Sequence, residues 1–447
     1  MTVCVPSCGR LKSWLHTGFP PPGLLRESRP LPKPPPSNQR GGKRQQKYPM
    51  VNPSLPASLD RLLIAVQVSH RAREMDLAIA FHSLDFRQRP SHTDNMNDQN
   101  LRDHLLPLRW QYVVTAAPES WELAFQDIIN VDASARITAS LCPGIIVVES
   151  ALRSVDLAQQ LRTSGIFVRH LFLLLDVIAQ RYSHERLAKI VDVSIGLRRH
   201  LNPAQSFSVQ TRTLSQDGPG NFEVNTLVSN AFMALGFRLD VKHPDQAISI
   251  VCTDFAVYLG ASPIAHNLSD WAGGMRRFAR DANQLSRAEF KLLEALEVFP
   301  LDLPYQGTVL DLGAAPGGWT RVCRQRGLSV VAVDPAVLDA RLTKDRGVTH
   351  VPSTAETYLT KTSGSEIFDL IVNDMRIDTT RSARLMCKAA KLLKRDQFAL
   401  MTLKLPAKHQ RRRIRDTLSV LSQSYRVGGV RKLFHNRSEV TAFLQKR

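Results

Sequence analysis

The sequence predicts an α/β protein whose C-terminal part is a doubly wound parallel sheet. Short β-branched runs at 308–312, 329–333, 348–351, 368–373 and 397–403 alternate there with helical patterns. Alternation at this spacing is typical of a parallel sheet with helices on both faces. The first of these runs ends in an aspartate, and a glycine-rich loop that opens a helix follows it. The chain has 447 residues and is 43% hydrophobic, which is enough for the cores of two or three domains.

The preceding part, residues 96–267, is expected to be a separate α+β region. Its predicted strands lie at 110–115, 145–149, 206–212 and 247–253, and its helices at 180–191 and 224–235. The apolar run 166–180 is too short and too charged to cross a bilayer, so we expect a buried helix there. Residues 268–284 are expected to connect this α+β region to the C-terminal sheet. We count them with the C-terminal domain, which is expected at 268–447. Gly428 and Gly429 are expected to form a turn between strands.

The positive charge is concentrated at the two ends of the chain. The 59 Lys and Arg residues exceed the 40 Asp and Glu residues, giving a net charge of +19. Residues 1–95 contribute +8 and residues 376–447 contribute +15, which leaves −4 for 96–375. Such a charge predicts an acidic partner, either nucleic acid or an anionic membrane surface. The composition excludes a wholly disordered chain, a collagen-like fibre and a disulfide-stapled miniprotein.

Residues 1–95 are expected to be a disordered leader. Residues 1–50 hold ten of the 26 prolines and nine basic residues with a single acid, and such a segment cannot bury enough apolar surface to fold. Two other interpretations stay open. One is an organellar transit peptide, and the other is a non-native extension, because Met96 stands shortly before the first clean strand. The six cysteines lack metal-ligand spacing, which favours a reducing, cytoplasmic setting without a bound metal.

The strongest motif is a loop after the first C-terminal strand, in the stretch TVLDLGAAPGGWT at 308–320. Glycines allow the backbone to approach a ligand at the carboxyl end of a strand. The spacing departs from the G-x-G-x-x-G of dinucleotide sites, and it fits a loop that holds the amino-acid end of S-adenosylmethionine. The next strand ends in an aspartate that can accept the ribose hydroxyls. The predicted cofactor-binding residues are Asp311, Gly313, Ala315, Pro316, Gly317, Gly318, Trp319 and Asp334, although core packing also explains the tryptophan.

These motifs resemble those of a known enzyme family. The stretch SRAEFKLLE at 286–294, followed by DLGAAPGGWT, resembles the FtsJ/RrmJ-type ribose 2′-O-methyltransferases. The later stretches VNDM (372–375), LKLP (403–406) and KLFHNRSEVT (432–441) are similar to the RlmM-type members. The resemblance implies a Rossmann-like methyltransferase domain that methylates a cytidine ribose in large-subunit ribosomal RNA.

Two lysines and two carboxylates supply the parts for this chemistry. A ribose hydroxyl is a poor nucleophile, so methyl transfer gains from a nearby base, which a lysine becomes when burial and a second cation lower its pKa. Asp374 and Lys404 follow or end buried strands and should face the cofactor. The resemblance assigns them, with Lys291 and Glu439, to a Lys-Asp-Lys-Glu tetrad. Lys404 is the expected base and Asp374 its orienting partner, while the other two tune charge and position the ribose.

Basic residues near this tetrad are expected to hold RNA phosphates. The run at 408–415 has five basic residues and no acid, although a solvated helix face also explains it. The predicted RNA-binding residues are Arg376, Lys408, Arg411, Arg412, Arg413 and Arg415. No residue is assigned to the adenine, because 351–354 lacks the carboxylate that the family usually offers. Glu356 is the nearest acid.

The region at about 200–262 is similar to a THUMP domain, which implies binding of structured RNA. The sequence as a whole therefore predicts an enzyme with S-adenosylmethionine as cofactor and RNA, as large-subunit rRNA or its precursor particle, as partner. No membrane partner is expected, and the oligomeric state stays open. The alternatives are a ribose methyltransferase for transfer RNA or an RNA cap, and a nonenzymatic RNA-binding or ribosome-assembly protein. The proline in the loop opposes a nicotinamide oxidoreductase.

Overall fold

The structure is a computed structural model that describes residues 109–179, 184–215, 218–279, 281–364 and 367–447. The predicted leader at 1–95 lies outside the described residues. Within the described ranges, no helix combines the length and the apolar composition that crossing a membrane requires.

The first described part is a four-stranded antiparallel sheet with two helices. Its elements are β1 (Trp110–Thr115), α3 (Trp121–Val131), β2 (Arg136–Cys142), β3 (Ile145–Ser150), α4 (Ser154–Ser164) and β4 (His170–Leu173). The strand order is β2-β3-β1-β4, with β3 and β4 both antiparallel to β1. This order in a βαββαβ chain is the split β-α-β motif of ferredoxin-like domains. The predicted strands at 110–115 and 145–149 are confirmed.

The prediction of a buried helix at 166–180 is wrong. Over the described residues, this segment forms β4 and then β5 (Asp176–Ala179), which belong to two different sheets. Leu171 packs into one hydrophobic cluster and its neighbour Phe172 into another, as expected for successive residues of a strand. A strand buried on both faces has an unbroken apolar run, and periodicity alone does not distinguish it from a buried helix.

The second part is a mixed five-stranded sheet in the order β5-β9-β8-β6-β7. Its remaining elements are α5 (His184–Gly196), β6 (Ser206–Thr213), α6 (Asn221–Ala234), β7 (Arg238–Leu239), β8 (Gln246–Cys252) and β9 (Ala256–Pro263). Val228 of α6 packs against Phe207 and Ile248 of the sheet. The predicted strands at 206–212 and 247–253 and the helix at 224–235 are confirmed within two or three residues. The region predicted to be THUMP-like lies within this sheet and its helices.

The third part is a seven-stranded sheet in the order β12-β11-β10-β13-β14-β16-β15. Its elements are α7 (Ala288–Val298), β10 (Thr308–Leu312), α8 (Gly318–Gln325), β11 (Ser329–Val333), α9 (Ala340–Thr343), β12 (Val348–Val351), α10 (Ala355–Lys361), β13 (Phe368–Asn373), α11 (Thr379–Ala389), β14 (Leu393–Lys404), α12 (Gln410–Leu421), β15 (Tyr425–Arg431) and β16 (Glu439–Lys446). The strands from β12 to β14 are parallel, and β16 is antiparallel to both of its neighbours. The predicted doubly wound fold is confirmed. Short 3-10 helices complete the described structure at Pro118–Ser120, Leu197–His200, Ile264–His266, Ala272–Gly274 and Ala390–Leu392.

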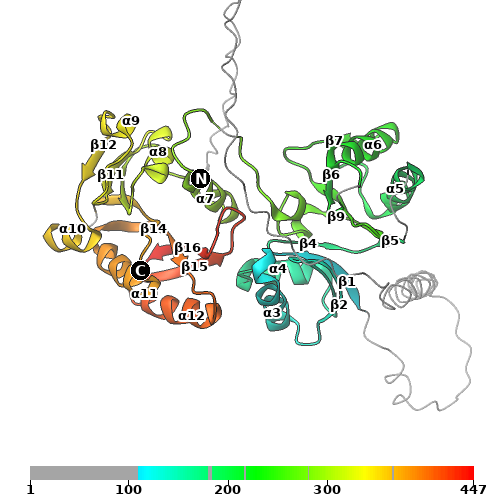
Figure 1. The fold of residues 1–447 in the computed structure, drawn as a ribbon, viewed down its shortest axis with the longest axis horizontal. Coiled ribbons are helices and arrows are strands. Elements are labelled where there is room, and N and C mark those ends of the chain that lie inside the picture. Colours follow the sequence, from blue (N-terminus) through cyan, green and yellow to red (C-terminus); the bar gives the residue numbers. More distant parts are fainter. Residues whose placement is uncertain (1–108, 180–183, 216–217, 280, 365–366) are drawn as a thin grey trace, which may run out of the picture. The chain divides into compact units, whose positions relative to one another are not determined.

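Helices cover both faces of this third sheet, as Figure 1 shows. Val309 of β10 packs with residues of α7 and α8, whereas its neighbour Leu310 packs with residues of α10, α11 and α12. The chain winds from β10 outward to β11 and β12, then returns to the other side of β10 as β13 and β14. Ligands of such sheets bind at the carboxyl ends of the strands where the winding reverses, here β10 and β13.

The expected turn at Gly428 and Gly429 is also wrong, because both residues lie inside β15. The pairing of β15 with β16 shifts register between Val427 and Gly429, which marks a bulge. A Cβ atom on Gly428 would collide with the ring of Phe443 on β16. The glycine therefore makes room for an aromatic ring on the neighbouring strand.

Candidate active site

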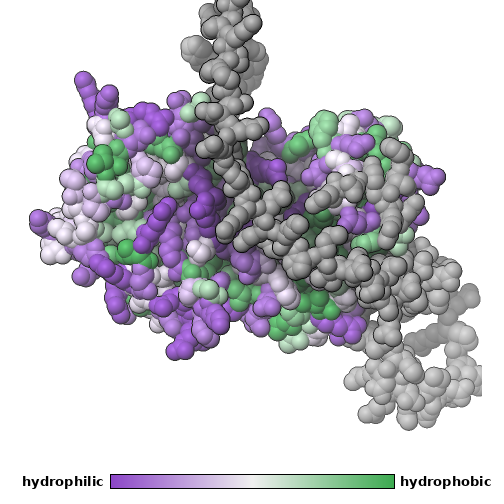
Figure 2. Space-filling model, viewed as in Figure 1, coloured by the Kyte–Doolittle hydropathy of each residue, from purple (hydrophilic) through white to green (hydrophobic). Residues whose placement is uncertain are grey.

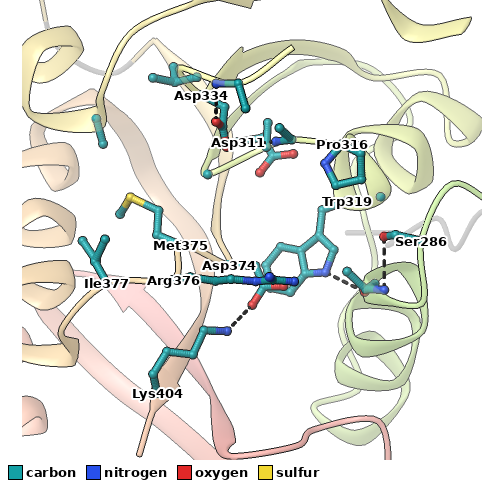
Figure 3. A pocket seen from close by; sticks show the side chains of 18 of the residues that line it. Ser286, Asp311, Pro316, Trp319, Asp334, Asp374, Met375, Arg376, Ile377 and Lys404 are labelled. Carbon is teal, nitrogen blue, oxygen red and sulfur yellow. Dashed lines mark hydrogen bonds and ion pairs between the residues drawn. The ribbon is translucent and has the colours of Figure 1, made fainter. Parts of the chain in front are cut away.

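A cavity of about 910 Å³ opens at the carboxyl ends of β10, β11, β13 and β14, where the winding of the sheet reverses. The loop after β10 lines one side of it, and the segment after β13 lines another (Figure 3). The start of α7 and the residues just before β16 complete the wall. A volume of this size accommodates a ligand as large as a nucleoside with its substituents.

The glycine-rich loop approaches the backbone of the neighbouring strand closely. Gly313 has a φ of 79° and Gly317 a φ of 116°, which are values that favour glycine. A Cβ atom on Gly313 would lie 2.9 Å from the Cα atom of Met375, just beyond β13. Asp334 fixes the loop from the end of β11, because its Oδ2 atom accepts a hydrogen bond of 3.1 Å from the backbone N–H of Ala315. The Asp334 carboxylate itself lines the cavity.

Asp311 lies beneath this loop and is almost fully buried. Its Oδ2 atom accepts a hydrogen bond of 2.6 Å from the Thr320 hydroxyl on α8. The pKa of Asp311 is raised to about 7, mainly because the carboxyl group is buried. The negative charges of Asp374 and Asp334 also raise this pKa, whereas the hydrogen bond from Thr320 lowers it. A carboxyl group with such a pKa at the base of a cavity is well suited to a cationic ligand, which would favour its ionised form.

Trp319 packs in the hydrophobic core and also borders the cavity, so its role in cofactor binding stays a prediction. It is 3% exposed and packs into the hydrophobic cluster between the sheet and α7 and α8. Its indole N–H donates a hydrogen bond of 2.8 Å to the backbone carbonyl of Ala288, and the ring also borders the cavity (Figure 3). The tryptophan thus ties the start of α8 to the start of α7, and both of these helix ends line the cavity.

The four residues of the predicted tetrad lie together at the end of the cavity nearest β14. Lys404 Nζ is 2.6 Å from Asp374 Oδ1, and Lys291 Nζ is 3.1 Å from Asp374 Oδ2. Lys291 Nζ is also 2.7 Å from Glu439 Oε1. The antiparallel pairing of β14 with β16 places Lys404 directly opposite Glu439. Two cations and two anions thus form one continuous cluster, while their catalytic role stays a prediction.

Mutual attraction within this cluster outweighs the cost of burial. Burial alone would raise the pKa of Asp374, but the charges of Lys404 and Lys291 hold that pKa below its ordinary value. Burial acts in the same direction on Glu439, and there the contact with Lys291 and the charge of Lys404 lower the pKa. Both carboxyl groups are therefore ionised at neutral pH.

Thr402 is a member of this cluster that the sequence analysis missed. Its hydroxyl donates a hydrogen bond of 2.7 Å to Asp374 Oδ1, and the Lys404 ammonium donates one of 2.8 Å to the Thr402 oxygen. The side-chain period of two in a strand places Thr402 and Lys404 on the same face of β14, which would have identified it. Other cavity-lining residues also escaped prediction: Ser286, Arg287, Met375, Ile377, Arg437 and Ser438. Arg437 and Ser438 directly precede Glu439 in the chain, so the prediction of Glu439 as a site residue could have been extended to them.

Arg376 borders the cavity, directly after Asp374 and Met375, and its binding to RNA stays a prediction. Glu356, the acid left unassigned, also lines the cavity, but it forms an ion pair with Arg381 whose Nη2–Oε1 distance is 2.6 Å. This pair neutralises the carboxylate on the side of the cavity toward β12. The adenine-binding residue therefore stays unassigned.

The basic run at 408–415 is less uniform than the sequence suggested. Lys408, Arg412 and Arg415 are exposed. Figure 2 shows hydrophilic side chains on the surface over α11 and α12. Arg411 instead donates a hydrogen bond of 2.6 Å to Asp127 Oδ1 of α3. Arg413 donates one of 3.0 Å to the Thr380 hydroxyl. As far as the structure describes the chain, the residues lining the cavity include none from α12, and RNA binding by this run stays a prediction.

Comparison with known proteins shows which family this domain is similar to. Residues 284–443 match the FtsJ-like methyltransferase family, and this range contains the cavity and all of the predicted tetrad. The C-terminal part is therefore similar to FtsJ-like methyltransferases, which agrees with the resemblance found in the sequence. S-adenosylmethionine is the cofactor of this class.

The named relatives point to one group within the class. The chain is 33% identical over 182 residues to a protein of Halorhodospira halophila named ribosomal RNA large subunit methyltransferase M, covering 39% of this chain and 51% of the relative. A protein of the same name from Shewanella loihica is 27% identical over 313 residues, covering 64% and 82%. The chain spans about half of the first of these relatives. Among solved structures, TrmN from Thermus thermophilus matches at 15% identity with a TM-score of 0.32, covering 76% of this chain and 100% of that one, which adds nothing to the assignment.

The residues present fit S-adenosylmethionine. Asp311 is a buried carboxyl group at the base of the cavity, which suits the ammonium group at the amino-acid end of this cofactor. Asp334 lines the cavity after the next strand, where a carboxylate can accept the two ribose hydroxyls. Gly313 and Gly317, both with positive φ, let the loop backbone approach a ligand at two positions between these carboxylates.

Proposed function

We propose that this chain transfers a methyl group from S-adenosylmethionine to a ribose 2′-oxygen in large-subunit ribosomal RNA. One observation carries the proposal, namely that two lysines and two carboxylates meet at the end of the cavity bordered by the glycine-rich loop. The names of the relatives support ribosomal RNA as the substrate. The resemblance of the stretches VNDM, LKLP and KLFHNRSEVT to the RlmM type supports a cytidine as the target.

Lys404 is positioned to accept the proton of the 2′-hydroxyl. Asp374 and Thr402 hold its Nζ atom at 2.6 Å and 2.8 Å, so the nitrogen has a fixed place at the cavity wall. When bound, S-adenosylmethionine supplies the methyl group and a positive charge on its sulfonium.

Lys291 and Glu439 keep the position and charge of Asp374 constant. Without Lys291, Asp374 would turn toward a single cation and would gain freedom to rotate. Glu439 in turn neutralises Lys291 and is only 5% exposed, so solvent does not compete for this pair. In the proposed role, these two residues act on the base through Asp374 and help to place the ribose.

Exposed cations around the cavity support RNA as the substrate. Arg376 and Arg437 both border the cavity, and the exposed side chain of Arg437 leaves its charge accessible to a phosphate. Such contacts add affinity without reading sequence. We further propose that the THUMP-like region at about 200–262 supplies the affinity for structured RNA that a small cavity cannot provide.

The test is transfer of a labelled methyl group. The full chain is incubated with labelled S-adenosylmethionine and unmodified large-subunit rRNA, free or in a precursor particle, and the RNA is then mapped for nucleotides that resist alkaline cleavage. We expect label at one ribose, which blocks cleavage there. Label on transfer RNA or a cap alone would overturn the choice of substrate, label on a base would overturn the reaction, and no label on any RNA would show a nonenzymatic protein.

A further inference from the structure

Three aromatic rings outside the cavity lining form a cluster that the proposed reaction does not use. Phe278 precedes α7, Phe290 lies on α7, and His435 belongs to the segment between β15 and β16. Phe278 and Phe290 are stacked, with ring centroids 5.5 Å apart and an interplanar angle of 17°. His435 lies 5.0 Å from Phe290 and 5.5 Å from Phe278, with its ring tilted to both.

These rings do not form part of a hydrophobic core. Of the described residues, those that make up the hydrophobic clusters of the three sheets include neither of the two phenylalanines. All three rings are only half buried, so each keeps part of its surface in solvent. Arg276 covers the Phe278 ring at 4.2 Å, which is a cation–π contact. A stacked aromatic group with a cation beside it at the surface is typical of sites that bind nucleic acid bases.

The segment that carries His435 is held by hydrogen bonds to α7 and to the segment before it. The Glu294 carboxylate accepts hydrogen bonds from the backbone N–H groups of Phe434 and His435, at 2.7 Å and 2.9 Å. The imidazole Nε2 donates to the backbone carbonyl of Arg276 at 2.9 Å. Burial lowers the pKa of His435, and the charges of Arg287 and Arg276 lower it further, so the ring is neutral at pH 7. A neutral ring held in one orientation offers a stacking surface at little entropic cost.

The cluster lies next to the proposed catalytic residues in the chain. Phe290 directly precedes Lys291, and His435 stands two residues before Arg437, which borders the cavity. Arg287 also lines the cavity, and its charge acts on His435. The residues that line the cavity and connect to these rings are the exposed Arg287 and Arg437, which are available for the phosphates between a nucleotide at Lys404 and its neighbours.

We propose that Phe278, Phe290 and His435 form a stacking platform for an unpaired base next to the methylated nucleotide. The inference rests on the proposed function and makes it more specific, because a base can stack on protein only when it has left an RNA helix. The substrate segment must therefore be single-stranded at and beside its target, such as a loop or bulge. A continuous duplex would not be methylated.

The test compares variants that keep apolar volume but lose the aromatic face. Phe278→Leu and Phe290→Leu are expected to raise the KM for RNA about tenfold each, since stacking is worth roughly 1–3 kcal/mol per base. The KM for S-adenosylmethionine should stay within twofold. His435→Phe keeps a ring and should retain activity, whereas His435→Leu should not. Tyr305→Leu is the matched control, because Tyr305 is 94% exposed and precedes β10 at the opposite end of the strand from the cavity.

A second measurement separates stacking from a purely structural role. Once the methylated position is mapped, the adjacent nucleotides are replaced in turn by abasic ones. For the wild-type chain, kcat/KM should fall about tenfold when one particular neighbour is abasic. Phe290→Leu has already lost the same contact, so the abasic nucleotide should lower its kcat/KM only slightly further. Equal losses in both proteins, or an unchanged KM for RNA in the leucine variants, would overturn the platform. Failure of the wild-type chain to methylate any RNA would instead overturn the proposed function.

Discussion

The tetrad in the cavity and the basic helix α12 use the same kinds of side chain with opposite results. The tetrad gathers Lys291, Asp374, Lys404 and Glu439 from a helix, a loop and two strands into one paired cluster. In α12, neighbouring arginines point in different directions, and Arg411 binds Asp127 while Arg412 is exposed. Strand ends meet at one edge of a sheet, but successive helix residues are separated by about 100°. Sequence proximity therefore says less about a shared site than topological position does.

The largest expected effect is at Lys404, and it tests whether the paired cluster, rather than the basic residues near α12, carries the reaction. Lys404→Ala should lower the rate of methyl transfer about 10³-fold, because it removes the proposed base from a site that is otherwise intact. Binding of S-adenosylmethionine, measured by calorimetry, should persist. A matched change, Lys408→Ala, alters an exposed lysine four residues on and should leave the rate within twofold. Full activity of Lys404→Ala would contradict the assignment of the base.

A smaller loss is expected from removing one anion of the cluster. Glu439→Gln leaves Lys291 with Asp374 as its only carboxylate partner within the cluster. Breaking a buried pair typically costs 3–5 kcal/mol, and we expect roughly 2 kcal/mol here because half of the pairing remains. Chemical denaturation measures it, and Glu356→Gln, which breaks a more exposed pair with Arg381, should cost under 1 kcal/mol. Equal costs for the two variants would show that the cluster is no more tightly coupled than a surface pair.

Asp311 should make stability depend on pH. Its pKa is raised by burial from 3.8 to about 7, so the folded chain holds a proton there that the unfolded chain releases. This contribution is fully present below about pH 4 and is lost as pH rises through 7, amounting to a few kcal/mol at most. Relative to Asp311→Asn, the wild type should therefore become progressively less stable between pH 4 and pH 8. Parallel stability profiles of the two proteins would contradict the raised pKa.

The smallest expected effect is on the KM for RNA, and it should differ between the exposed and the paired arginines of α12. Arg412→Ala combined with Arg415→Ala should raise the KM for RNA about threefold and reduce its salt dependence, if these exposed groups hold phosphates. Arg411→Ala should leave the KM for RNA unchanged and lower the melting temperature, because it removes the cation that pairs with the buried Asp127 carboxylate. An unchanged KM in the double variant would leave the run as a solvated helix face.

Sequence reasoning succeeded where local pattern and sheet geometry coincide. The limits of β10 and the place of Asp374 just after β13 followed from apolar runs that end at a polar residue. Sequence reasoning failed where contacts with distant parts of the chain determine the local structure. Leu171 and Phe172 form a strand because a second sheet covers their other face, and Gly428 is required by a ring on the neighbouring strand. Neither partner can be identified from the local sequence.

The position of β16 between β14 and β15 has a consequence for protein synthesis. Glu439 lies opposite Lys404 in the sheet but follows it by 35 residues in the chain. A nascent chain that has left the ribosome only as far as Lys404 already holds the glycine-rich loop and three members of the tetrad, yet it lacks the fourth. The insertion of β16 then supplies that member and attaches β15 to the sheet in the same event. Under the proposed function, methylation activity would report that the C-terminal strand has been both synthesised and correctly inserted.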